Sequence, residues 1–334
     1  MVHQPPLLEI RNLRVEFPTR RGTLVAIDDV SLQIGEGEVL GVVGESGAGK
    51  SITGAAVIGL LPEPGRIAGG EIRLNGRRID GLPEEALRRI RGKEVGAIFQ
   101  DPLTSLNPLY SIAAQLVETI RTHLDLRPQD ARRRALDLLK EVGIPAAEDR
   151  MDGYPHEFSG GMRQRIVIAL ALAAHPKLVI ADEPTTALDV SIQAQIIAVL
   201  KRLCRDHHAS VMLITHDMGV IAEAADRVAV MYAGRLAETG PVADVIRRAQ
   251  HPYTHGLMGS IPQLTARTDR LVQIEGAMPR LTELPAGCAF HPRCPRAMDR
   301  CRADRPPVVS AATGHQVACW LFEDAAAPAE RRDG

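Results

Sequence analysis

The sequence predicts an α/β fold in which a parallel sheet is covered on both faces by helices. Short apolar strands are expected at Val39–Val43, Leu178–Ala181 and Val211–Thr215, and the last two each follow a helical stretch. Alternation of this kind is typical of parallel sheets. Residues from about 102 to 176 carry helical periods punctuated by prolines, so we expect them to form a helical insertion in the core.

Two further strands and several helices are expected from hydrophobic periodicity. Residues Leu7–Phe17 alternate between apolar and polar side chains, and Leu24–Ile34 has the pattern of a second strand. The small apolar residues after Ser51 predict a helix. Inside the insertion, helical periods occur at Ile112–Thr122 and Gln129–Val142.

The chain is expected to have three parts. Residues 1–250 form the main domain, and residues 251–323 form an extension that is punctuated by prolines and holds four cysteines. Residues 324–334 are rich in alanine, proline and charge, so they are predicted to be disordered.

Composition limits the possible functions. Hydrophobic residues make up 45% and charged residues 24% of the chain, as in soluble globular proteins. A net charge of −1 gives no basic field, so we expect no nucleic-acid partner. We see no signal-peptide pattern, and the apolar run Ile166–Ala174 is far shorter than the roughly 18 residues that span a bilayer. Any membrane passage would therefore belong to other chains.

A phosphate-binding loop follows the first apolar strand. The pattern G-x-x-x-x-G-K-[ST] lies between a predicted strand and a predicted helix, where backbone N–H groups and the helix N-terminus can bind phosphate. Lys50 would neutralise the β- and γ-phosphates, and the Ser51 hydroxyl would bind Mg²⁺. The expected ATP-binding residues here are Gly44, Glu45, Ser46, Gly47, Ala48, Gly49, Lys50, Ser51 and Ile52.

Two later strands end in polar residues that complete a hydrolytic site. Asp182 would lie near the Mg²⁺ shell, and Glu183 is the candidate general base for the attacking water. An acidic pair after a strand often merely caps the next helix, but the phosphate loop favours the catalytic interpretation. His216 follows another buried strand, where it is either a structural histidine or a donor to the γ-phosphate.

A third segment resembles a known family. Phe158-Ser159-Gly160-Gly161-Met162-Arg163-Gln164-Arg165 is similar to the signature motif of ATP-binding-cassette (ABC) ATPases, although Phe158 and Met162 depart from its commonest form. Gln100 resembles the family's glutamine loop, Ala187-Leu188-Asp189 its D-loop, and His216 its switch histidine. The resemblance implies an ABC nucleotide-binding domain over residues 1–250: a RecA-like parallel-sheet core, an antiparallel β subdomain and the inserted helical subdomain.

The resemblance also implies an ATP site shared between two chains. Cassettes of this family pair head to tail, so Ser159, Gly160 and Gly161 would contact ATP held by a partner's phosphate loop. Gln100 would add a Mg²⁺ contact. Phe17 matches the aromatic that stacks on adenine, and the alternative is a phenylalanine of the strand core.

Further stretches resemble one branch of the family, the oligopeptide/dipeptide importers. They are Phe99–Pro108, Ala181–Val190 and His251–Thr254. The resemblance implies an ATPase on the cytoplasmic face of the membrane, working with a second, paralogous cassette, two transmembrane permease subunits and an extracytoplasmic substrate-binding protein. Peptides are the expected cargo, with nickel or glutathione as alternatives. A soluble ABC ATPase acting on DNA or ribosomes, or a sensor, are the competing classes.

Four cysteines mark the extension: Cys288, Cys294, Cys301 and Cys319. The segment shows no apolar core of its own, so a metal would stabilise it. Zinc ligands are usually paired two to four residues apart, which these gaps do not match, whereas iron–sulfur clusters accept looser spacing. The branch carries a [4Fe–4S] cluster in a similar region, so the resemblance implies one here. Zinc and unligated thiols are the alternatives.

Overall fold

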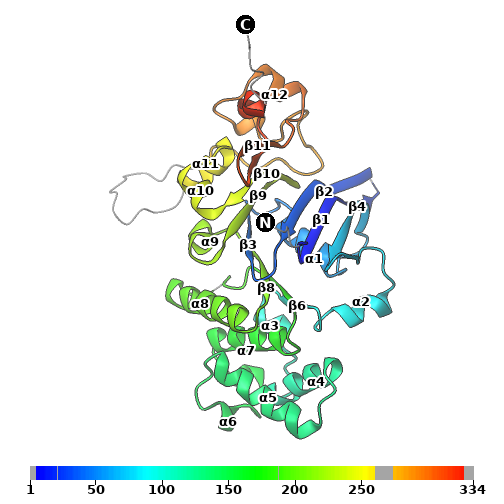
Figure 1. Ribbon diagram of the computed structural model, residues 1–334, viewed down its shortest axis with the longest axis vertical. Helices are drawn as coiled ribbons and strands as arrows, with labels where there is room; N and C mark the ends of the chain where they lie inside the picture. Colours follow the sequence, from blue (N-terminus) through cyan, green and yellow to red (C-terminus); the bar gives the residue numbers. More distant parts are fainter. Residues whose placement is uncertain (1–4, 21, 187, 260–273, 327–334) are drawn as a thin grey trace.

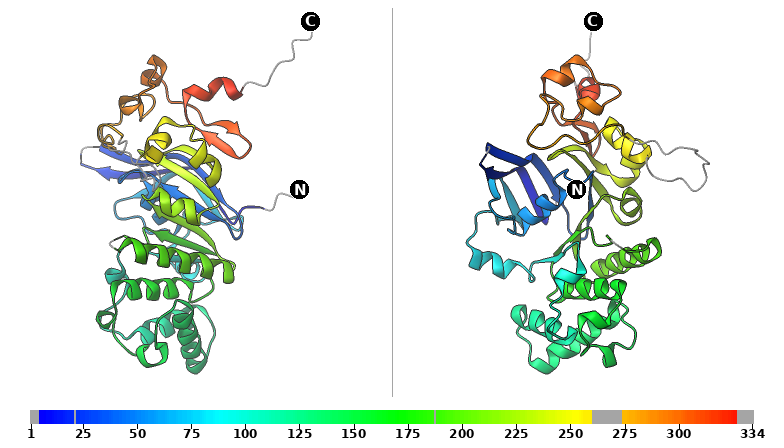
Figure 2. Two further views of the ribbon diagram at one scale, coloured as in Figure 1. Left: turned by 90° about the vertical axis from the view of Figure 1, so that its left-hand side faces the viewer. Right: turned by 180° about the vertical axis from the view of Figure 1, so that it is seen from behind.

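The computed structural model describes residues 5–20, 22–186, 188–259 and 274–326 (Figure 1). Two sheets occupy the middle of an elongated molecule (Figures 1 and 2). The helical segment lies at one end of it, and the C-terminal extension lies at the other.

The main sheet has eight strands and is parallel through its centre. In spatial order they are β11 (Val309–Ala312), β12 (His315–Val317), β10 (Arg235–Pro241), β9 (Arg227–Tyr232), β3 (Val39–Val43), β8 (Ser210–Thr215), β7 (Leu178–Asp182) and β6 (Val95–Ile98). The strands from β9 to β6 pair in parallel, whereas β10, β12 and β11 add antiparallel strands at one edge. This arrangement confirms the predicted α/β class.

Both faces of the parallel part are buried because apolar residues fill the central positions of its strands. In β8, Val211 and Leu213 face the core shared with the helices, while Met212 and Ile214 face the core shared with the second sheet. Strand side chains point alternately to opposite faces, so an unbroken apolar run serves two cores at once.

The second sheet is antiparallel and lies on the α1 side of the core (Figure 1). Its strand order is β2 (Gly22–Ile34), β1 (Leu8–Thr19), β4 (Arg66–Leu74) and β5 (Arg77–Arg78). The two strands predicted at the start of the chain are confirmed as β1 and β2. The hydrophobic pattern of the sequence did not predict the pairing of β1 with β4.

Helices cover the main sheet. The α-helices are α1 (Lys50–Val57), α2 (Glu84–Ile90), α3 (Pro102–Ser105), α4 (Ile112–His123), α5 (Pro128–Glu141), α6 (Ala147–Arg150), α7 (Gly160–Leu172), α8 (Val190–Asp206), α9 (Met218–Ala224), α10 (Val242–Arg247), α11 (Pro252–Gly259) and α12 (Asp299–Ala303), and the 3₁₀ turns are η1 (Pro155–Glu157), η2 (His291–Arg293) and η3 (Trp320–Ala326). Helices α3 to α7 also form the helical segment, which lies between strands β6 and β7 in the sequence. Over the described ranges, none of the chain's helices has the length and apolar character needed to cross a membrane.

The C-terminal extension joins the main domain more closely than its irregular sequence suggests. Strand β12 pairs with β10, so the end of the chain enlarges the main sheet. Phe290 is buried, and its ring centroid lies 5.2 Å from that of Tyr232 and 5.4 Å from that of Tyr253. Among the described residues, the buried apolar side chains of the extension therefore join the core of the main domain rather than a core of the segment's own. Of the predicted disordered tail, residues 324–326 belong to η3, and residues 327–334 lie outside the described ranges.

A buried carboxylate fastens the extension to the sheet. The Glu238 side chain in β10 is fully buried and accepts three hydrogen bonds. Its donors are the backbone N–H groups of Gln250 (2.8 Å) and His251 (2.9 Å) and the Nε2 atom of His315 (2.7 Å). One side chain thus ties β10 to α11 and β12.

We expect Glu238→Ala to lower the free energy of unfolding by about 3–5 kcal/mol, because it leaves three buried donors without an acceptor. Denaturant unfolding measures this change. Glu323→Ala is the matched control, since it removes the exposed pair with Arg300. Surface pairs contribute at most about 1 kcal/mol, so a Glu238→Ala effect that small would contradict the assignment.

Candidate nucleotide-binding site

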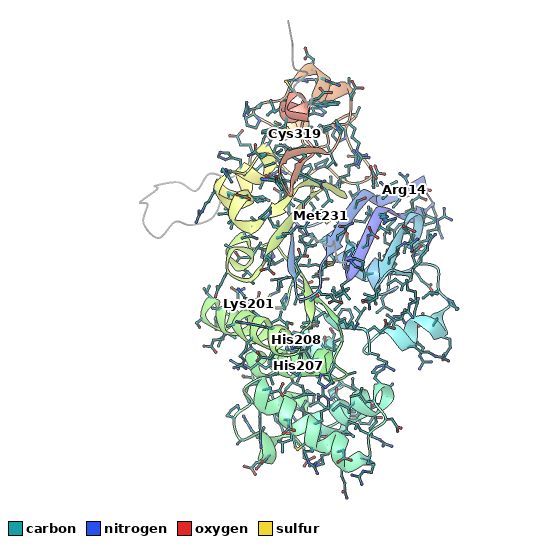
Figure 3. All side chains as sticks on the ribbon, in the orientation of Figure 1. Arg14, Lys201, His207, His208, Met231 and Cys319 are labelled. Carbon is teal, nitrogen blue, oxygen red and sulfur yellow. The ribbon has the colours of Figure 1, made fainter. Side chains whose placement is uncertain are left out.

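The phosphate loop connects β3 to α1, and two of its glycines are required by the backbone. Gly44 has φ +153°, and a Cβ there would lie 2.2 Å from the carbonyl oxygen of Met231 in β9 (Met231 is labelled in Figure 3). Gly49, the residue before α1, has φ +102°, and its Cβ would lie 2.6 Å from Ile27 Cδ1. Any larger residue at either position would strain the loop.

Lys50 lies inside the loop and is only 5% exposed. Its Nζ atom donates to the carbonyl oxygens of Gly44 (2.9 Å) and Glu45 (3.0 Å). Burial lowers the pKa of Lys50, and the carboxylates of Glu183, Asp182 and Glu45 act in the opposite direction. The loop therefore holds a poorly solvated cation, which an anionic phosphate would stabilise.

The end of β7 lies beside the start of α1. The Ser51 hydroxyl donates to Asp182 Oδ1 at 2.9 Å. Burial raises the pKa of Asp182, and the bond from Ser51 and the charge of Lys50 oppose that rise. A hydroxyl and a carboxylate are oxygen ligands of the kind that Mg²⁺ takes together with phosphates.

Glu183 is the centre of a polar cluster. Its carboxylate accepts from Gln100 Nε2 at 3.0 Å and from the Thr186 hydroxyl at 2.9 Å, and it lies 3.4 Å from His216 Nδ1. Its φ of +46° is unusual for a residue with a side chain and costs about 1–3 kcal/mol, a strain that is common at functional sites. Thr186 is a contact that the sequence analysis missed, although its spacing three residues after Glu183 could have suggested it.

One cavity brings most of the predicted residues together. Its lining also includes Leu24, Ala26, Pro62 and Leu281, which the sequence analysis did not anticipate. Ala48 is fully buried, and Glu45 is turned toward the C-terminal extension. The predicted residues that line the cavity are Phe17, Ser46, Gly47, Gly49, Lys50, Ser51, Ile52, Gln100, Glu183 and His216.

The signature segment lies apart from this cavity. Ser159 caps the N-terminus of α7 and accepts from Met162 N at 3.4 Å. Among the described residues, Ser159, Gly160 and Gly161 are not part of the lining that contains Lys50. Asp189 is exposed at the start of α8, and the neighbouring Ala187 lies outside the described residues.

The four cysteines of the extension line one small cavity next to His291 and Trp320. Figure 3 labels Cys319 in this part of the molecule. Burial raises the pKa of Cys319 to about 11 and also raises the pKa of Cys288 and Cys294. In the parts of the chain that the structure describes, no set of three or more His, Cys, Asp or Glu side chains has an arrangement that could hold a metal ion. The four cysteines share one cavity, but as they are placed they do not form the ligand set of the predicted iron–sulfur cluster.

The fold and the phosphate loop define the chain as a phosphate-loop nucleotide-binding protein. Residues 27–186 match the ABC transporter family, and residues 237–301 match the family described as "Oligopeptide/dipeptide transporter, C-terminal region". The chain is 46% identical over 319 residues to the oligopeptide transport ATP-binding protein AppD of Bacillus subtilis. This match covers 95% of this chain and 97% of AppD. It is 44% identical over 323 residues to the dipeptide transport ATP-binding protein DppD of Escherichia coli, and this match covers 96% of this chain and 99% of DppD.

Solved structures agree with this assignment. A dimeric structure of the ATP-binding cassette MJ0796 in a post-hydrolysis state with ADP and Pi has a TM-score of 0.63 and 27% identity, and covers 70% of this chain and 98% of that one. The chain cbiO1 from Clostridium perfringens has the same TM-score and identity, and covers 73% and 92%. The chain therefore belongs to the ABC transporter ATPases, in the branch of oligopeptide/dipeptide transport ATP-binding proteins.

We expect Glu183→Gln to reduce ATP hydrolysis by about 100-fold or more while leaving ATP binding intact, because it would remove the candidate general base and keep the shape of the side chain. Phosphate release and equilibrium ATP binding measure the two effects. Glu223→Gln, a change at an exposed glutamate outside the cavity, serves as the control. Hydrolysis at the wild-type rate in Glu183→Gln would rule out this glutamate as the base.

Proposed function

We propose that this chain hydrolyses ATP to power the import of di- and oligopeptides by a multi-subunit transporter. The observation that carries the proposal is a pair of contacts beside the buried Lys50. Ser51 contacts Asp182, and His216 contacts Glu183. The oligopeptide and dipeptide transport names of its relatives support the cargo class.

Each polar residue of the site has a proposed task in the reaction. Lys50 and the loop N–H groups bind the phosphates, and Ser51 and Asp182 hold Mg²⁺, which when bound neutralises the developing phosphate charge. Glu183 accepts a proton from the attacking water. His216 and Gln100 orient the γ-phosphate and the water, and both already contact Glu183. Phe17, at the edge of the same cavity, stacks on adenine.

A second cassette completes the site in this proposal. Ser159, Gly160 and Gly161 lie outside the cavity that contains Lys50, and Val190 beside Asp189 is 82% exposed. Both observations suit residues that act across an interface between two cassettes, and the related cassette MJ0796 was solved as a dimer. We propose that the partner is a paralogue of this chain.

The helical segment is the proposed contact with the permease subunits at the cytoplasmic face of the membrane. Phe99, Leu103, Leu109 and Tyr110 are large apolar side chains that are 46–80% exposed near the start of this segment. Gln100 lies next to Phe99 and contacts Glu183, so nucleotide occupancy can be transmitted to this surface. An extracytoplasmic binding protein would deliver the peptide.

The transport proposal predicts that peptides stimulate hydrolysis by the purified transporter in proteoliposomes. The complex is isolated through a tag on this chain, its subunits are identified, and phosphate release is compared with and without peptide. The Glu183→Gln complex is the control for contaminating ATPases. Stimulation by nickel or glutathione, with none by peptides, would overturn the cargo assignment and leave the ATPase assignment standing.

We also propose that Cys288, Cys294, Cys301 and Cys319 hold a [4Fe–4S] cluster, with zinc as the competing metal. The support is that all four cysteines, of which Cys301 is buried and the others are half-buried, line one cavity. Since burial raises the pKa of Cys288, Cys294 and Cys319, metal binding by these thiols must release protons. The bound cluster would cross-link the segments that carry the cysteines.

Anaerobically purified protein is expected to contain iron and acid-labile sulfide and to lose both in the Cys294→Ser variant. Cys204→Ser is the matched control, because Cys204 is buried alone in α8. Elemental analysis and visible absorption are the measurements. Stoichiometric zinc in a colourless protein would contradict the cluster.

A further inference from the structure

The C-terminal extension reaches the phosphate loop through one arginine. Arg293 in η2 makes a two-pronged ion pair with Glu45, with Nη1–Oε2 at 2.7 Å and Nη2–Oε1 at 3.0 Å. Its side chain is only 7% exposed. The same guanidinium donates from Nε to the carbonyl oxygen of Glu275 at 3.0 Å, so its position is fixed from two sides.

Three more residues of the extension touch the loop or its cavity. The backbone N–H of Glu45 donates to the Tyr253 hydroxyl at 2.8 Å, and Tyr253 is fully buried. Met278 packs so close to Gly47 that a Cβ on that glycine would lie 3.0 Å from Met278 Cε. Leu281 lines the cavity that contains Lys50. The extension is therefore part of the wall of the nucleotide site.

The charge of Glu45 explains why the arginine matters. A carboxylate in a loop that binds phosphates repels the ligand, and such repulsion is strong where water is partly excluded. The two hydrogen bonds from Arg293 neutralise this charge and turn the carboxylate away from the cavity. A guanidinium suits the task because its planar fork binds both carboxylate oxygens.

We propose that Arg293 is a positioning residue for ATP: by holding and neutralising Glu45, it makes the C-terminal extension a determinant of nucleotide affinity. The proposal rests on the ATP site proposed above. It assigns the extension a role in the cassette's own chemistry, separate from any metal that the cysteines bind.

The test is the affinity of the full-length chain for MgATP, measured with a fluorescent ATP analogue and by competition with ATP. We expect Arg293→Gln to raise Kd about tenfold, because Glu45 becomes an unpaired negative charge. The double variant Glu45→Gln/Arg293→Gln is expected to return to within about threefold of the wild type, because the repulsive charge is gone as well. Glu45→Gln alone should lower Kd, because it removes the negative charge and leaves the guanidinium of Arg293 beside the loop.

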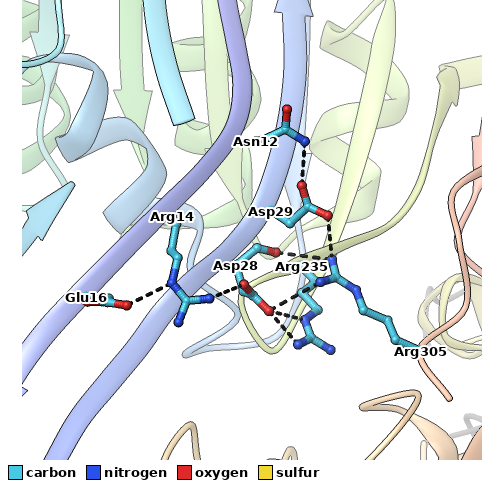
Figure 4. Close-up of polar contacts among 7 residues, drawn as sticks. All are labelled: Asn12, Arg14, Glu16, Asp28, Asp29, Arg235 and Arg305. Carbon is cyan, nitrogen blue, oxygen red and sulfur yellow. Dashed lines mark hydrogen bonds and ion pairs between the residues drawn. The ribbon is translucent and has the colours of Figure 1, made fainter. Parts of the chain in front are cut away.

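The matched control is Arg305→Gln. Figure 4 shows that Arg305 also joins the extension to the main domain, through Asp28 and Asp29 of β2. Its hydrogen bonds are to Asp28 and Asp29 rather than to the phosphate loop, and Asp28 keeps its bonds from Arg14 and Arg235. If general loosening of the extension caused the effect, this variant would weaken ATP binding as well.

The outcomes separate the hypotheses. Wild-type affinity in Arg293→Gln, or a double variant as weak as Arg293→Gln, would overturn the role of Arg293, as would an equal loss in Arg305→Gln. If circular dichroism shows that Arg293→Gln does not fold, Glu45→Gln becomes the test. A tenfold rise of Kd in Glu45→Gln would then overturn the proposed role of Arg293. Failure of the wild type to bind MgATP would refute the ATP site itself.

Discussion

The parallel register of four strands is the constraint on which the site depends. Val43 pairs with Thr215, Ile214 with Asp182, and Ala181 with Ile98, so β3, β8, β7 and β6 end at one edge of the sheet. The phosphate loop, His216, Glu183 and Gln100 follow directly after these strand ends. Parallel pairing therefore gathers residues that are far apart in the sequence, and ligands bind at this edge in open α/β sheets generally.

The groups gathered at this edge are in an environment that favours charged ligands. Burial disfavours the charged forms of both Lys50 and Asp182, and their pKa values shift in opposite directions as a result. Phosphate oxygens beside the ammonium and a cation beside the carboxylate would each restore lost solvation. The site is thus arranged for an anion and a metal together, which is the form in which ATP is used.

The sequence was sufficient for the features that depend on local pattern. Strand Val39–Val43 and the glycines of the phosphate loop were predicted because a short apolar run and a strand–loop–helix motif are visible in short windows. The contact of Gln100 with Glu183 joins residues 83 positions apart, and only the family resemblance suggested that they meet. Strands β11 and β12 were missed because they are short and alternate weakly, and their pairing with β10 is decided by tertiary contacts.

The cysteine group and the phosphate loop are also joined in a way that no local pattern shows. Arg293 immediately precedes Cys294, so the residue that holds Glu45 is one peptide bond from the thiol cavity. Glu45 and Arg293 are 248 positions apart, which hides the pair from any reading of neighbouring residues.

That separation has a consequence for how the protein is made. During synthesis the phosphate loop leaves the ribosome long before Arg293 and the edge strands β11 and β12. Contacts between such distant positions carry a large loop-closure cost and form late. The nascent chain therefore completes this wall of its nucleotide site only after Arg293 has been made, and a product truncated before Arg293 would carry an intact phosphate-loop motif without that wall.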